Sequence, residues 1–189
     1  MMDFETLKQT CLACEKCSLC KTRTQVVFGM GNPHAEVLLI GEAPGKNEDE
    51  QGLPFIGRSG QLLDTYLSAI HLYRTDNIFI TNIVKCRPPE NRDPLPAEWK
   101  TCLPYLHAQC AVIRPKSVLC LGRIAAQRLI RPDFSIMKEH GQWSEIDNVF
   151  YTATLHPAAL LRNPHNKPLA SADFAALQEK IKAVCTHTY

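Results

Sequence analysis

Val37-Leu38-Leu39-Ile40, which ends at Gly41, is the stretch of sequence that decides the fold. A continuous apolar run that stops at a glycine is typical of a strand buried on both faces, as strands of parallel sheets are. Short apolar runs at residues 78–80 and 118–121, together with the stretch at 149–155, predict three further strands. The sequence therefore predicts a small sheet whose two faces are both covered.

Helical patterns separate these strands. Helices are expected over residues 3–14, after Ser59, from Pro96 onward, over 123–130 and, with Ser171 as the N-cap, over 172–184. Long loops are expected from Glu42 to Arg58 and from Asn82 to Pro96. Strands that alternate with helices predict parallel pairing and an α/β sandwich.

The composition indicates a folded protein without a membrane span. Of 189 residues, 45% are hydrophobic, which supports a core and excludes wholesale disorder. The net charge of +2 neither requires nor excludes a polyanionic partner. No apolar run approaches the roughly 18 residues of a membrane span, and residues 1–5 lack the features of a secretory signal. We therefore expect a cytoplasmic protein.

Nine cysteines in such a chain favour metal binding or catalysis over disulfides. Four of them form a C-x2-C-x2-C-x2-C run from Cys11 to Cys20. Structural zinc usually takes two separate short pairs, whereas iron–sulfur clusters take four thiolates that can lie far apart in the chain, so a cluster is favoured. The spacing leaves open whether the run supplies every ligand or only two, with Cys86 and Cys102 supplying the rest. The remaining three, in apolar stretches, are expected to be buried: Cys110, Cys120 and Cys185.

The loops beyond the carboxyl ends of the strands are the expected ligand site, as in other parallel α/β sheets. The segment from Gly41 to Asn47 fails as a phosphate loop, because Asn47 stands where a serine or threonine would bind magnesium. No G-x-S-x-G nucleophile elbow occurs. These loops therefore carry unusual residues without a nucleotide or hydrolase signature.

Charge is distributed unevenly around these loops. Residues 82–131 hold nine Lys or Arg against three acids, whereas residues 36–64 hold six acids against two bases. A basic region beside an acidic loop suits a protein that grips a phosphate backbone with one region and handles a neutral base with another. An ordinary solvated surface with uneven charge is the alternative.

Four ordered blocks carry a family resemblance. They are Gly41-Glu42-Ala43-Pro44-Gly45-Lys46-Asn47-Glu48-Asp49, Pro54-Phe55-Ile56-Gly57-Arg58-Ser59-Gly60, Thr81-Asn82-Ile83-Val84-Lys85-Cys86-Arg87-Pro88-Pro89 and Leu155-His156-Pro157-Ala158. Together they resemble the family 4 (thermostable-type) uracil-DNA glycosylases, from about Cys14 to the last helix. The resemblance implies the fold of the uracil-DNA glycosylase superfamily, a three-layer α/β/α sandwich with a central four-stranded parallel sheet. It also implies a single domain over residues 1–189.

The activity that this resemblance implies is DNA repair. The enzyme would flip uracil out of DNA and hydrolyse its N-glycosidic bond, leaving an abasic site. Phe55 would stack on the pyrimidine, and the Asn82 amide would pair with uracil O4 and N3–H. His156 would stabilise the charge that develops on O2, either as a neutral donor or as a cation.

The remaining implied site residues belong to the first block. The backbone around Gly41, Glu42 and Ala43 would help to bind O2. Glu48 would either reject the methyl group of thymine at C5 or place the attacking water, and Glu42 would contact water or sugar. His156, Glu42 and Glu48 are thus the candidate catalytic residues.

By motif position, the resemblance implies a structural 4Fe–4S cluster on Cys14, Cys17, Cys86 and Cys102. The N-terminal helix and cysteine run, residues 3–20, would dock on this cluster. Because Cys86 follows Asn82 by four residues, the cluster would anchor the loop that reads the base.

The expected partner is uracil-containing DNA, single- or double-stranded, with no membrane partner. We expect a monomer in the cytoplasm, associated with the nucleoid, and a sliding clamp stays an open candidate partner. Two other functions stay open. One is a protein trapped covalently on uracil-containing DNA, although the Arg- and His-rich insertion of that sister group is missing after Phe55. The other is an iron–sulfur accessory module of replication.

Overall fold

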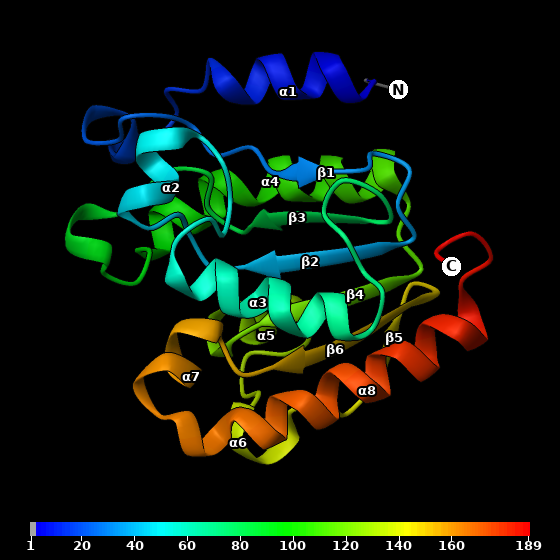
Figure 1. The fold of residues 1–189 in the computed structure, drawn as a ribbon. Helices are drawn as coiled ribbons and strands as arrows, with labels where there is room; N and C mark the ends of the chain where they lie inside the picture. Colours follow the sequence, from blue (N-terminus) through cyan, green and yellow to red (C-terminus); the bar gives the residue numbers. More distant parts are fainter. Residues whose placement is uncertain (1–2) are drawn as a thin grey trace.

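The computed structural model describes residues 3–189, which form a six-stranded sheet with helices on both faces (Figure 1). Met1 and Met2, at the start of the stretch that was expected to lack a secretory signal, lie outside the described residues. The strands are β1 (Met30–Gly31), β2 (Val37–Gly41), β3 (Ile78–Asn82), β4 (Ser117–Leu121), β5 (Ser144–Ile146) and β6 (Val149–Thr154). The helices are α1 (Phe4–Leu12), α2 (Lys46–Gln51), α3 (Arg58–Ala69), α4 (Pro96–Ile113), α5 (Arg123–Leu129), α6 (Ile136–Glu139), α7 (Pro157–Arg162) and α8 (Lys167–Val184), with short 3-10 helices at Ser18–Lys21, Pro89–Asn91 and Pro164–Asn166.

The four central strands are parallel, as predicted, in the order β3-β2-β4-β6. Two edge strands were not predicted: β1 pairs antiparallel with β3, and β5 pairs antiparallel with β6. These edges are two and three residues long and carry no apolar run, so no periodic signal marks them. The sheet is therefore mixed but mostly parallel.

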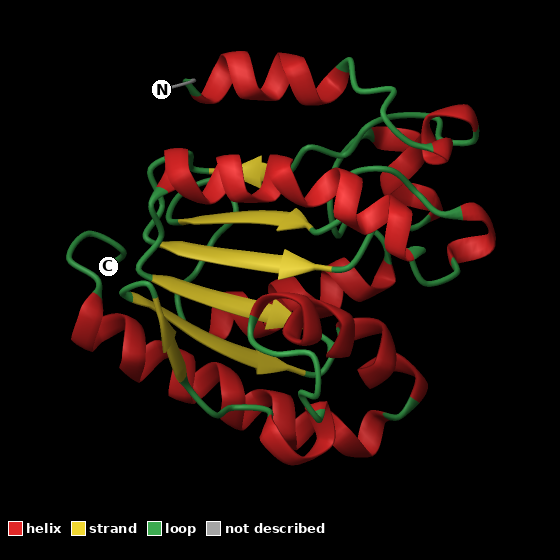
Figure 2. Cartoon of the chain, turned by 180° about the vertical axis from the view of Figure 1, so that it is seen from behind, coloured by secondary structure: helices red, strands yellow, loops and turns green. Residues whose placement is uncertain are grey.

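The side chains of β2 alternate between two hydrophobic cores, as the twofold period of a strand requires. Leu38 and Ile40 join the core that α4 and α5 cover, whereas Val37 and Leu39 join the core that α3 and α8 cover. Figure 1 shows α3 and α8 in front of the sheet, and Figure 2 shows the opposite face. This arrangement is the predicted α/β/α sandwich.

Three local predictions were wrong. The loop expected from Glu42 to Arg58 contains α2, whose six residues are mostly polar and bury only Asp49. The last helix begins at Lys167, and Ser171 lies inside it, where its hydroxyl donates to the Lys167 carbonyl. Helix α3 begins at Arg58, so Gly57 rather than Ser59 is its N-cap.

The carboxyl ends of the parallel strands lie along one edge of the sheet. Strand β2 ends at Gly41 and β3 at Asn82, and these two residues are paired across the strands. Gly122 follows β4, and His156 follows β6 by two residues. The fold thus brings four of the conspicuous loops together. Among the described residues no helix is long and apolar enough to cross a membrane.

Candidate active site and cysteine cavity

Gly41 is the point at which the candidate site residues meet. A Cβ atom on Gly41 would collide with the Asn82 side-chain oxygen and with the Phe55 ring. The Gly41 backbone is therefore in close contact with both side chains, and only glycine leaves them this space. Two segments that are 27 residues apart in sequence, around Phe55 and Asn82, thus converge at the end of β2.

Asn82 is buried and has an unused acceptor. Its side-chain oxygen, Oδ1, lacks a hydrogen-bond partner among residues 3–189, although the residue is only 2% exposed. Leaving a buried polar atom unpaired costs about 1–3 kcal/mol. Such a group on the last residue of a strand, at the carboxyl edge of the sheet, is free to accept a hydrogen bond from a ligand.

His156 is held as a neutral side chain with a defined tautomer. It is the N-cap residue of α7, and its Nδ1 accepts a hydrogen bond from the Ala158 backbone N–H at 3.1 Å. Burial lowers the pKa of His156 to about 4, with a further contribution from Arg162 that Glu48 opposes. Because Nδ1 accepts, the proton of the neutral ring lies on Nε2. At neutral pH, His156 therefore offers one N–H donor.

Phe55 lies beside His156, and its backbone is strained. The two ring centroids are 5.9 Å apart, with 35° between the planes. The φ angle of Phe55 is 52°, in the left-handed region. For a residue other than glycine, this backbone conformation costs about 1–3 kcal/mol, and such strained residues are found mostly at functional sites. The surrounding contacts must therefore hold this conformation.

Glu48 supplies one of these contacts. From α2, its Oε1 accepts hydrogen bonds from the backbone N–H groups of Ile56 and Gly57, both at 3.0 Å. The carboxylate thus holds the loop that carries Phe55, and its negative charge raises the pKa of His156, against the larger effect of burial. The structure brings Glu48 to the site, with one oxygen already engaged by the loop.

Glu42 lies at the rim of the site with a perturbed carboxyl group. Burial raises its pKa to about 7, and the negative charge of Asp93 raises it further, whereas Arg123 opposes the shift. A carboxyl group with this pKa can exchange a proton near neutral pH. Neighbouring Ala43 is half-buried and packs against the core beneath the loop.

The Asp93–Arg123 ion pair at this rim was not predicted from the sequence. The pair joins the proline-rich loop to the start of α5 at 3.3 Å. Gly122, before Arg123, has a φ of 97°, and a Cβ there would lie 2.8 Å from the His156 Cβ. The only sequence signal was the position of Gly122-Arg123 after a strand, which identified the edge but not the partner.

Six cysteines line one cavity between α1, the cysteine run, the loop after β3 and α4. They are Cys11, Cys14, Cys17, Cys20, Cys86 and Cys102. Arg23 donates to the Cys86 sulfur at 3.4 Å and to the Cys14 carbonyl at 2.7 Å. The backbone N–H of Lys85 donates to the Cys102 sulfur at 3.3 Å. Hydrogen bonds of this kind stabilise thiolate sulfur.

These six cysteines line a cavity and do not converge on one metal-ion position. In the described part of the chain, no group of three His, Cys, Asp or Glu side chains is placed to hold a single metal ion. Outside the cavity, Cys120 is buried as predicted, whereas Cys110 and Cys185 are only half-buried at the margins of the two cores. The expectation of full burial was wrong for those two.

Comparison with known proteins identifies relatives over nearly the whole chain. The profile of the "Uracil DNA glycosylase superfamily" matches residues 28–182. The Type-4 uracil-DNA glycosylase of Archaeoglobus fulgidus is 41% identical over 187 residues, covering 95% of this chain and 94% of the relative. That of Sulfurisphaera tokodaii is 40% identical over 187 residues, 95% of this chain and 85% of the relative. That of Thermotoga maritima is 38% identical over 168 residues, 87% and 86% respectively.

Proposed function

The chain belongs to the uracil-DNA glycosylase superfamily and is a uracil-DNA glycosylase of DNA repair, and we propose that it binds an extruded uracil between Phe55, Asn82 and His156. It then hydrolyses the N-glycosidic bond and leaves an abasic site. The observation that carries this proposal is the buried, unpaired Oδ1 of Asn82, beside the Phe55 ring.

Asn82 selects the base. Its Oδ1 accepts from the N3–H of uracil, and its amide NH2 donates to O4. Cytosine presents an acceptor at N3 and a donor at the adjacent exocyclic position, so both contacts would be mismatched. A site built to pair polar groups discriminates strongly, because the wrong base leaves them unpaired. Phe55 adds a stacking face, which contributes roughly 1–3 kcal/mol per base.

His156 stabilises the leaving group. Uracil departs with negative charge on O2 and N1, and the neutral Nε2–H donates to O2. Charge-assisted hydrogen bonds strengthen as this charge develops, so the donor lowers the barrier more than it stabilises bound substrate. The low pKa of His156 is consistent with a hydrogen-bond donor rather than a cation. The backbone of Gly41, Glu42 and Ala43 lies at the same strand end and contributes to binding O2.

Glu42 handles the water. Its pKa of about 7 leaves a substantial carboxylate fraction at neutral pH, and a carboxylate at the rim accepts a proton from the attacking water. Glu48 acts on the pocket through its contacts with the loop of Phe55, which it holds in place, and it adds negative charge near His156. That charge also favours the cationic sugar of the transition state.

A 4Fe–4S cluster on Cys14, Cys17, Cys86 and Cys102 is the second part of the proposal. The residues fit the group: the cavity is lined by sulfur, and Arg23 and the Lys85 N–H already donate to two of these thiols. When bound, the cluster supplies iron–thiolate bonds that join segment 3–20, the loop after β3 and α4. The Lys85 side chain donates a hydrogen bond to the Asn82 backbone carbonyl at 2.5 Å. A cluster held beside Lys85 would therefore also stabilise the position of Asn82, which reads the base.

Uracil release from a single-stranded oligonucleotide, detected as alkali-induced strand breaks, tests the site. We expect Phe55→Ala, Asn82→Ala and His156→Ala each to lose most activity while the protein keeps the brown colour of an iron–sulfur cluster. Wild-type rates in Asn82→Ala and His156→Ala would reject the site. A denaturant-stable DNA adduct without turnover would reject hydrolysis.

A further inference from the structure

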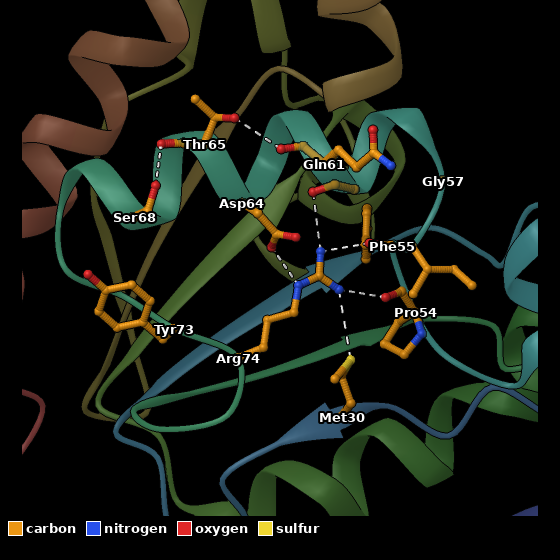
Figure 3. A network of polar contacts seen from close by, with 12 residues as sticks. Met30, Pro54, Phe55, Gly57, Gln61, Asp64, Thr65, Ser68, Tyr73 and Arg74 are labelled. Carbon is orange, nitrogen blue, oxygen red and sulfur yellow. Dashed lines mark hydrogen bonds and ion pairs between the residues drawn. The ribbon is translucent and has the colours of Figure 1, made fainter.

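Arg74 makes an unusual set of contacts with the loop that carries Phe55. It lies in the turn between α3 and β3, and its side chain is only 11% exposed. The guanidinium donates to the carbonyls of Pro54 at 2.7 Å and Phe55 at 2.6 Å, and more weakly to that of Gly60 at 3.3 Å (Figure 3). Its Nε also bonds Asp64 at 2.6 Å. Most of the hydrogen bonds that Arg74 donates to oxygen therefore go to backbone carbonyls and not to the Asp64 carboxylate.

Gly60 shows how closely the Phe55 carbonyl is held. A Cβ atom on Gly60 would overlap the carbonyl oxygen and carbon of Phe55. The carbonyl is thus confined between the first turn of α3 and the guanidinium. Any other residue at position 60 would push the Phe55 peptide out of reach of Arg74.

The loop that carries Phe55 is also held through its backbone N–H groups. Glu48 accepts from the N–H groups of Ile56 and Gly57, whereas Arg74 donates to the carbonyls of the two preceding residues. A cation on the carbonyls and an anion on the N–H groups fix the orientation of this short backbone segment. Phe55, with its positive φ of 52°, lies at its centre. These contacts oppose the relaxation that the strained residue would otherwise undergo.

We propose that Arg74 is a positioning residue for the reaction, which sets the Phe55 ring at the angle that stacks on uracil. This inference rests on the proposed function, in which Phe55 contacts the base. The planar, forked guanidinium reaches two carbonyls at once, which a lysine ammonium on a flexible stem does not reproduce. Arg74 acts through the backbone of Phe55 and not on the substrate.

The test is a double-mutant cycle between Arg74→Met and Phe55→Ala, with kcat/KM on uracil-containing single strands and the inhibition constant of free uracil as readouts. We expect Arg74→Met to lower kcat/KM by about ten- to hundredfold and to weaken uracil binding. In the Phe55→Ala background the same substitution should change both quantities less than about threefold, because interacting residues are not additive. Arg74→Lys, which keeps a cation beside Asp64, should resemble Arg74→Met.

The matched control is Asp64→Asn, which removes the ion pair and leaves the carbonyl contacts in place. Asp64 is half exposed, and we expect near wild-type kinetics. Equal losses from Arg74→Met in both backgrounds would overturn the inference, since Arg74 would then act independently of Phe55. Full activity in Arg74→Lys would overturn it as well. Full activity in Phe55→Ala would instead reject the stacking role in the proposed function, so the two failures are distinguishable.

Discussion

Gly41 and Asn82 lie opposite each other at the ends of β2 and β3, and the Asn82 side-chain oxygen occupies the space that a side chain on Gly41 would fill. The Phe55 ring borders the same space. One backbone position thus determines whether the amide and the ring can share a pocket.

Gly41→Ala tests this relationship. The added methyl group would displace the Asn82 amide and the Phe55 ring together, and overpacking of this kind costs about 1–3 kcal/mol of stability. We expect a larger relative effect on activity, a loss of about a hundredfold in kcat/KM, because small misplacements of reacting groups are costly. Gly31→Ala, at a positive φ of 128° beside Ile78 at the amino end of β3, is the control. It should lose stability and keep its kcat/KM.

Asn82→Asp tests base selection. In its protonated form, an aspartate can donate to cytosine N3 and accept from the exocyclic amino group, whereas its ionised form only accepts. Burial favours the protonated form. We therefore expect reduced release of uracil and new, slow release of cytosine, measured on oligonucleotides that differ in that one base. An enzyme that still prefers uracil to the wild-type degree would show that Asn82 does not read the base.

The central sheet was predictable because the parallel strands carry mostly apolar runs between polar loops, and Gly41, Asn82 and His156 lie within two residues of the ends of such runs. Their convergence follows from parallel pairing alone. The resemblance then supplied their roles. This part of the site required no knowledge of side-chain packing.

The polar supports of the site were not predictable in the same way. Helix α2 has no apolar periodicity, and Asp49 is buried because it accepts from the backbone N–H groups of Thr24 and Gln25, far away in sequence. Arg74 likewise bonds carbonyls, which every residue has. No residue type marks those partners in the sequence, so such contacts appear only once the chain is folded.

Cys86→Ala tests the cluster. Removing one ligand should give colourless, poorly soluble protein with little iron or sulfide, because the proposed cluster would join three segments of the fold. Cys110→Ala, outside the cavity, should stay brown and active, and Cys20→Ala, inside it but not assigned as a ligand, should do the same. Iron and sulfide analysis with visible absorption measures all three. A brown, fully active Cys86→Ala protein would reject this ligand.

The contacts between Glu36 and the C-terminal residues should make the stability of the protein depend on pH in the acid range. The buried carboxylate accepts from the backbone N–H groups of Thr186 and His187, and Lys116 lies 2.8 Å away. Burial alone would raise the pKa of Glu36, but the contacts with Lys116, His187 and Thr186 prevail and lower it to about 2. A folded-state pKa below the ordinary value of 4.5 means that this stabilisation is complete above about pH 4.5 and is lost as the pH falls toward 2.

Glu36→Gln should therefore cost about 1–3 kcal/mol of unfolding free energy at pH 7; this range already allows for the partial exposure of Lys116. The difference from wild type should shrink as denaturant unfolding is repeated from pH 4.5 down to 2. The exposed Glu179–Lys182 pair offers the control, since Glu179→Gln should cost less than about 1 kcal/mol. A difference that stays constant with pH would contradict the role of the charge.

The pH dependence of catalysis should follow Glu42 and not His156. If the Glu42 carboxylate accepts the proton of water, kcat/KM rises as pH increases through the pKa of about 7 and then levels off. His156, with a pKa of about 4, stays neutral throughout this range and adds no second inflection. Glu42→Gln should give a low rate that is flat across pH 7.

The neighbours of Glu42 allow the assignment to be tested without removing the carboxyl group. Asp93 raises the pKa of Glu42 and Arg123 lowers it, so Asp93→Asn should shift the rise in kcat/KM to lower pH. The effect of Arg123 is measured in a protein that already carries Asp93→Asn. There, replacing Arg123 as well should shift the rise in kcat/KM to higher pH than in Asp93→Asn alone. Both partners are largely exposed, so shifts below about one pH unit are expected. Opposite shifts, or an inflection that ignores both substitutions, would show that another group titrates.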